Sequence, residues 1–139
     1  MSALLQFDGG SKPNPGKCAG AYVIYEYINK EKIIAEGGIY ISHGTNNVGE
    51  YSGLLSGLER CLSLGIKNLV VEGDSLLVVS QVSGKWKVKN DRLYIIFDKI
   101  ITLVKMFDIF EIRHIRREYN YHADKQSDKT IELEKNWEN

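Results

Sequence analysis

Residues 3–16 read Ala-Leu-Leu-Gln-Phe-Asp-Gly-Gly-Ser-Lys-Pro-Asn-Pro-Gly, an apolar run that changes abruptly into turn-forming residues. The apolar part predicts a β-strand over residues 3–7. The glycines and prolines that follow predict a loop that begins at Asp8. The chain therefore opens with a buried strand that ends directly before a carboxylate.

Two further strands are predicted next in the chain. Residues 19–28 and 32–41 are rich in β-branched and aromatic side chains, and Asn29-Lys30 separates them as a turn. Their short connections favour antiparallel pairing with each other and with the first strand.

From Asn47 onward the apolar residues change to a helical period. Residues 47–64 carry apolar side chains on one helical stripe, and Gly65 stands where a helix should stop. The same reasoning gives a buried strand at 69–74, a short helix at 75–82, a helix at 93–104, a strand at 109–115 and a helical tail from about residue 122. A strand, helix, strand succession implies parallel pairing. The expected fold is α/β: a mixed five-stranded sheet of three antiparallel and two parallel strands, flanked by helices.

Length and composition favour one folded domain over residues 1–139. Hydrophobic residues make up 43% and charged residues 26% of the chain, which excludes a largely disordered or collagen-like protein. Eighteen basic residues balance eighteen acidic ones, so net charge argues neither for nor against a polynucleotide partner.

The start of the chain lacks the basic and long apolar regions of a signal peptide, and no apolar run approaches membrane-spanning length. We therefore expect an intracellular, cytoplasmic protein without a membrane partner. Cys18 and Cys61 lack CxxC spacing and are expected to be reduced thiols without a zinc site.

Four carboxylates stand out by their joint placement. Singly, each has an ordinary structural explanation: Asp8 could begin a turn, Asp74 could cap a helix, and Glu50 and Asp124 suit first helical turns. However, Asp8 and Asp74 both end apolar strands, where an unpaired carboxylate is costly to desolvate. Clustered carboxylates repel one another unless a divalent cation neutralises them, and oxygen ligands suit Mg²⁺. The scarcity of His and Cys argues against zinc.

Four segments carry a specific resemblance to a known family. They are, in order, Asp8-Gly9-Gly10-Ser11-Lys12-Pro13-Asn14-Pro15-Gly16, Thr45-Asn46-Asn47-Val48-Gly49-Glu50, Glu72-Gly73-Asp74-Ser75 and Asn120-Tyr121-His122-Ala123-Asp124. Together they resemble the motifs of type 1 ribonucleases H over residues 3 to about 128, in a compact form that lacks a basic insertion. The resemblance implies that the four carboxylates gather at one edge of the sheet.

The resemblance also implies the chemistry of the site. Asp8 would bridge two Mg²⁺ ions, with Mn²⁺ as a possible substitute, while Asp124 would complete one ion and Glu50 with Asp74 the other. Such a site hydrolyses the RNA strand of RNA·DNA hybrids and leaves 5′-phosphate and 3′-hydroxyl ends. Asp128, one turn after Asp124, could serve instead, but the motif spacing favours Asp124.

Asn14, Asn46 and Asn47 lie in the motif loops. The ribose 2′-hydroxyl is the backbone group that distinguishes RNA from DNA, and amides can both donate to it and accept from it. Asparagine is also an ordinary turn former. With the motifs present, we favour contact with the hybrid.

A second group of residues is expected to hold the DNA strand. Trp86 and Lys89 lie in a segment of alternating lysines that suits a phosphate backbone, although a solvated basic loop is the plain alternative. Asn90 and Thr45 resemble the family's phosphate pocket. His43 stands where relatives commonly have an arginine, and an exposed histidine without a role is an equal alternative.

The other two histidines are assigned no role. His114 alternates with apolar strand residues and is expected to be packed, and His122 lies within the fourth motif, close to the expected site. Two other functions remain open: a non-catalytic nucleic-acid-binding module of this fold, and a related nuclease that acts on DNA. The four carboxylates argue against the first, and the asparagines against the second. We expect a monomer with no deducible protein partner.

Overall fold

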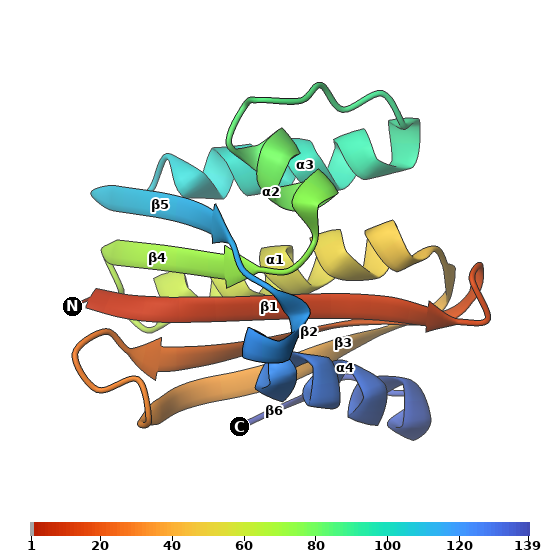
Figure 1. Ribbon diagram of the computed structural model, residues 1–139, viewed down its shortest axis with the longest axis horizontal. Helices are drawn as coiled ribbons and strands as arrows, with labels where there is room; N and C mark the ends of the chain where they lie inside the picture. The colour runs from red at the N-terminus through yellow and green to blue at the C-terminus, as the bar shows by residue number, and fades with distance from the viewer. Residues whose placement is uncertain (1) are drawn as a thin grey trace.

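Strand β1 (Ser2–Lys12) runs through the middle of the sheet in the computed structural model, which describes residues 2–139 (Figure 1). It pairs antiparallel with β2 (Gly16–Glu26) and parallel with β4 (Asn68–Gly73). Its apolar residues are buried on both faces, and Leu5 and Phe7 are wholly inaccessible to solvent. The opening apolar run therefore becomes the central strand.

The sheet has six strands in the order β5-β4-β1-β2-β3-β6. Strand β3 (Ile33–Gly44) pairs antiparallel with β2, and β5 (Ile109–His114) pairs parallel with β4, as predicted. The expected number of five strands is wrong, because β6 (Trp137–Glu138) adds a short antiparallel edge beside β3. Two residues are too few to show the alternation by which a strand is recognised in a sequence.

Helices cover both faces of this sheet (Figure 1). On one face lie α1 (Asn46–Ser63), α2 (Leu76–Val82) and α3 (Asp91–Val104), and on the other lies α4 (Tyr121–Leu133). All four were predicted to within two residues at most ends. No helix among residues 2–139 combines the length and the apolar character needed to cross a membrane.

The backbone of α1 lies directly against β1 and β2. A Cβ atom on Gly9 would collide with the backbone of Gly49, and one on Gly20 would collide with the backbone of Gly53. We call these four residues the glycine seam. Because side chains are absent there, the first turn of α1 reaches the middle of β1.

Strands β1 and β4 separate near one end of the sheet. Their pairing stops at Phe7 and Gly73, while β1 continues to Lys12 beside β2 alone. The expectation that β1 ends before Asp8 is therefore wrong, because Asp8 pairs with Ala21 inside the strand. The glycines after Asp8 serve close backbone contact rather than a turn. The gap between the two strands opens a cleft beside Asp8.

Candidate active site

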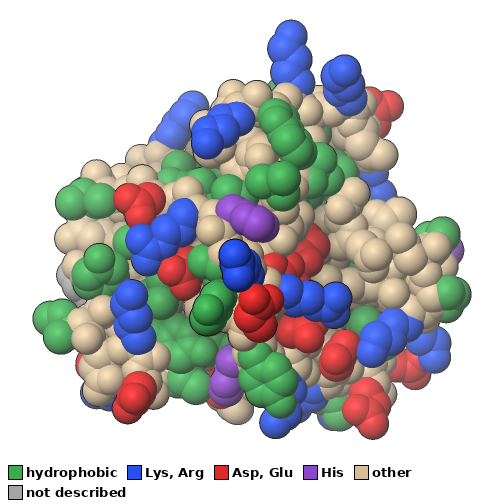
Figure 2. Space-filling view, viewed as in Figure 1, with side chains coloured by type: hydrophobic (Ala, Val, Ile, Leu, Met, Phe, Trp, Pro, Cys, Tyr) green, Lys and Arg blue, Asp and Glu red, His purple; other side chains and the backbone are tan. Residues whose placement is uncertain are grey.

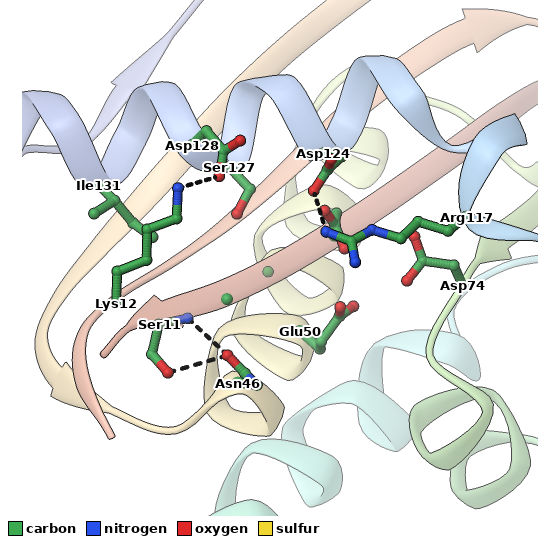
Figure 3. Close-up of a pocket in the computed structure, with 13 residues that line it drawn as sticks. Ser11, Lys12, Asn46, Glu50, Asp74, Arg117, Asp124, Ser127, Asp128 and Ile131 are labelled. Carbon is green, nitrogen blue, oxygen red and sulfur yellow. Dashed lines mark hydrogen bonds and ion pairs between the residues drawn. The ribbon is translucent and has the colours of Figure 1, made fainter. Parts of the chain in front are cut away.

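The cleft beside Asp8 has a volume of about 270 Å³ and is lined by β1, α1, α4 and the turn after β4 (Figure 3). All four predicted carboxylates line it: Asp8, Glu50, Asp74 and Asp124. They come from four separate elements, so the fold itself brings them together. Near the centre of this face, acidic side chains lie next to lysines and arginines (Figure 2).

Three of these carboxylates form a tight cluster. Asp8, Glu50 and Asp74 each offer an oxygen, and these oxygens lie within 4.8 Å of one another. Asp8 is 4% exposed and Glu50 is 7% exposed. Among residues 2–139, the Glu50 Oε2 atom is buried without a hydrogen-bond partner. A set of hard oxygen donors with an unsatisfied buried atom fits a divalent ion such as Mg²⁺.

The cluster strongly disfavours its own ionisation. The pKa of Asp8 is raised to about 8, chiefly by burial and also by Asp124 and Asp74, while a hydrogen bond with Glu50 acts in the opposite direction. Burial and the neighbouring Asp8 raise the pKa of Glu50 well above its ordinary value. Desolvation and like charges both penalise the charged forms. A bound cation would remove this penalty.

Asp124 lies beside Asp8 but outside the cluster of three. Its Oδ1 is 3.7 Å from an Arg117 nitrogen, and the Arg117 side chain extends toward it across the cleft (Figure 3). On the same helix, Asp128 pairs with Lys12 at 2.9 Å. Asp128 lines the cleft and, like Asp124, lies outside the cluster of three carboxylates, so the preference for Asp124 stays a prediction.

Sequence reasoning missed the two cations of the cleft, Arg117 and Lys12. Lys12 was read only as part of a motif, and Arg117 lies in a 3₁₀ turn (Arg117–Tyr119) before α4. The basic run Arg113, Arg116, Arg117 ahead of the fourth motif was the available signal. The buried side chain of Asn120, which contacts Asp74, was also missed.

Two of the predicted asparagines meet at the end of the cleft. Asn46 Oδ1 accepts from the Ser11 backbone N–H at 2.9 Å, and Asn14 Oδ1 accepts from the Asn46 backbone N–H at 3.1 Å. These bonds join the loop after β1 to the start of α1. Asn47 is exposed in the first turn of α1 and is not part of this network.

The residues expected to form a phosphate pocket lie at the beginnings of α1 and α3. Thr45 and Asn90 are the N-caps of these helices, and their side-chain oxygens accept from Val48 N at 3.3 Å and Leu93 N at 3.0 Å. Helix capping therefore explains in part why Thr45 and Asn90 stand at these positions.

An arginine that was not predicted links these two helix ends. Arg92 donates to the His43 carbonyl at 3.1 Å, which joins the first turn of α3 to the end of β3. His43 itself is exposed. Trp86, 48% exposed, and Lys89 lie in the loop that precedes α3. None of these residues lines the carboxylate cleft.

Of the two remaining histidines, His114 differs from expectation. His114 is exposed rather than packed, because it is the last residue of the edge strand β5, and a ring nitrogen lies 3.2 Å from the Asp74 carbonyl. His122 contacts Glu36 of β3 at 3.2 Å and does not line the cleft.

Comparison with known proteins gives consistent matches. A family described as reverse transcriptase-like matches residues 6–130. A bifunctional protein of Mycobacterium tuberculosis is 35% identical over 125 residues, which are 90% of this chain and 34% of that protein. A ribonuclease HI of Halobacterium salinarum is 33% identical over 126 residues, 91% of this chain and 62% of that protein. The chain thus spans about a third of the first relative's length and less than two thirds of the second's.

Solved structures agree with these matches. The N-terminal RNase H domain of a Mycobacterium tuberculosis protein superposes with a TM-score of 0.92 at 32% identity, with 96% of each chain covered. RNase H1 of Halobacterium salinarum superposes with a TM-score of 0.90 at 32% identity, covering 96% of this chain and 99% of that one. LC11-RNase H1, solved in complex with an RNA/DNA hybrid, gives 0.87 at 31% identity, covering 94% and 97%. The chain therefore belongs to the reverse transcriptase-like family and, within it, to the type 1 ribonucleases H.

Proposed function

We propose that this chain is an endoribonuclease that hydrolyses the RNA strand of RNA·DNA hybrids with divalent metal ions. The observation that carries the proposal is the buried cluster of Asp8, Glu50 and Asp74, with oxygens within 4.8 Å of one another. Ionised carboxylates in such a cluster destabilise the native state through desolvation and mutual repulsion unless a cation is bound. The relatives named ribonuclease HI and RNase H1 support the same reaction.

Asp8, Glu50, Asp74 and Asp124 would hold two Mg²⁺ ions, with Mn²⁺ as a substitute. When bound, such ions supply an activated water and neutralise charge on the phosphate, which leads to 5′-phosphate and 3′-hydroxyl ends. Asp8 is suited to a central position because it lies within β1, where it pairs with Ala21 of β2. Asp124 is suited to a peripheral position because Arg117 holds it beside the cluster.

The hybrid would be recognised along the loop that joins β1 to α1. The oxygens of Asn14 and Asn46 are used within the protein, so their NH₂ groups are the atoms that can donate to a ribose 2′-hydroxyl. Asn47, exposed on the next residue, is placed to make a similar contact. LC11-RNase H1 was solved with an RNA/DNA hybrid, which supports this substrate class.

The DNA strand would lie across the beginnings of α1 and α3. Thr45 and Asn90 place two helix N-termini there, and each N-terminus favours a phosphate. His43 and Arg92 add cationic character, and Trp86 with Lys89 extends the surface along the preceding loop. Bases and sugars can pack on the half-exposed indole ring.

The test is one set of incubations with labelled RNA·DNA hybrid, duplex DNA and duplex RNA, each with and without Mg²⁺. We expect cleavage of the hybrid's RNA strand alone, only with metal, and none by Asp8→Asn. Cleavage of duplex DNA would indicate a DNA nuclease instead. Binding of the hybrid without any cleavage would indicate a non-catalytic module. Sedimentation of the same sample tests the expected monomer.

A further inference from the structure

The side chain of Asn120 lies where β1 and β4 separate. The two strands pair as far as Phe7 and Gly73, and β1 then continues without β4. Asn120 is fully buried there, at the N-terminus of α4. Its Nδ2 atom donates to the Phe7 carbonyl at 2.8 Å and to Asp74 Oδ2 at 3.1 Å. One amide group thus connects β1 to the carboxylate that follows β4.

The orientation of this amide is determined by its partners. A backbone carbonyl and an ionised carboxylate both only accept hydrogen bonds, so the NH₂ side of the amide must face them. Each of its two hydrogens then serves one acceptor. Replacing the amide by a group with one hydrogen would release one of the two partners.

This arrangement leaves the other atom of the amide unsatisfied. Asn120 Oδ1 is buried without a hydrogen-bond partner among residues 2–139. A buried carbonyl oxygen without a partner destabilises the native state. Stability alone therefore poorly explains why an asparagine occupies position 120. This points to a role for the two hydrogen bonds that its Nδ2 atom donates.

We infer that Asn120 is a positioning residue that fixes the Asp74 carboxylate relative to Asp8. Phe7 immediately precedes Asp8, so the bridge from its carbonyl to Asp74 Oδ2 sets the spacing between two of the three clustered carboxylates. The same bond holds one oxygen of the Asp74 carboxylate, which belongs to the cluster. Asn120 thus keeps the ligand set in place before a metal ion arrives, and this inference rests on the proposed metal-dependent function.

The test compares Asn120→Ala with a matched control, Thr130→Val. Thr130 is also fully buried in α4 and bonded on both sides, donating to Gln126 O at 2.7 Å and accepting from Trp137 Nε1 at 2.8 Å. It lies outside the cleft. Two quantities are measured for each variant: the Mg²⁺ dependence of the melting temperature without substrate, and kcat and KM for a hybrid across a Mg²⁺ titration.

We expect Asn120→Ala to require about 10- to 100-fold more Mg²⁺ for the same rise in melting temperature, as is typical when a group that orients a metal ligand is removed. The kcat at a fixed low Mg²⁺ concentration should fall by a similar factor, while KM for the hybrid stays within about twofold. Thr130→Val should melt at a lower temperature yet keep the wild-type Mg²⁺ response and kcat.

An Asn120→Ala protein that merely loses stability, with the Mg²⁺ response and kcat of Thr130→Val, overturns the inference. If Asn120→Ala does not melt cooperatively, the same criteria apply to Asn120→Ser, which keeps one donor and should show a smaller loss of Mg²⁺ affinity. A wild-type protein without metal-dependent cleavage would instead refute the proposed function, so the two failures are distinguishable.

Discussion

Asp8→Asn should stabilise the metal-free protein while it abolishes cleavage. The native pKa of Asp8 is raised from 3.8 to about 8, chiefly by burial. The native chain therefore binds more protons than the unfolded chain between about pH 4 and pH 8, so stability falls as pH rises through this window. An asparagine has no charge to desolvate, and its amide can donate to Glu50.

The size of the effect follows from the same pKa. A solution at pH 7 is about 3 pH units above the ordinary Asp8 pKa of 3.8 and still below the native pKa of about 8. Each of these pH units corresponds to about 1.4 kcal/mol of the free energy of unfolding. Asp8→Asn can therefore raise the free energy of unfolding by at most about 4 kcal/mol. Because Glu50 and Asp74 also take part in the repulsion, we expect an increase of about 2 to 4 kcal/mol. For a chain of 139 residues this raises the melting temperature by about 10 °C.

The assay is thermal unfolding of wild type and Asp8→Asn in EDTA at several pH values from 4 to 8. The difference in stability should be near zero at pH 4 and should grow toward pH 7. Asp128→Asn is the control, since Asp128 is exposed and paired with Lys12 at 2.9 Å, and it should give no comparable gain. A difference that is absent at pH 7, or that does not depend on pH, would refute the reasoning.

Three further outcomes are expected. Mg²⁺ should raise the melting temperature of wild type far more than that of an Asp8→Asn, Asp74→Asn double variant, and equal shifts would place the ion elsewhere. Hybrid affinity measured in Ca²⁺ should be higher for His43→Arg than for wild type, because a guanidinium is always charged and binds phosphate, and equal affinities would remove His43 from the binding surface. Gly9→Ala should lower the free energy of unfolding by about 1 to 3 kcal/mol or more, because the new methyl group meets the Gly49 backbone, and an unchanged melting temperature would contradict this.

Much of the fold could be predicted because buried apolar residues recur in the sequence with the period of the helix or strand that carries them. The helical stripe after Asn47 and the predicted strand 69–74 correspond to α1 and β4 within one residue at each end. The same method failed where tertiary contact decides the structure. Strand β6 depends on Trp137, which bonds to Thr130 of α4, and Gly9 looked like part of a turn although it serves contact with α1.

The four carboxylates could be found because each lies in an ordered motif. The residues that contact these carboxylates could not be found in the same way. Their side chains contact segments that are distant in the sequence, and local sequence patterns carry no information on such contacts. Arg117 approaches Asp124 from a separate turn, and Asn120 reaches back to Phe7, 113 residues away. His114 was expected to be packed because it alternates with apolar residues, but β5 ends there.

The glycine seam has a consequence for how this protein can vary. It joins the backbone beside Asp8 to the backbone beside Glu50 without intervening side chains, so the separation of the two backbone segments that carry these carboxylates does not depend on other side chains or on the neighbouring loops. Loops outside the seam, including the one that carries Trp86, can then be lengthened or recharged in a directed-evolution library to alter substrate preference at little risk to the placement of Asp8 and Glu50. Substitutions within the seam have no such freedom, because a clash between two backbones cannot be relieved by changing a nearby side chain.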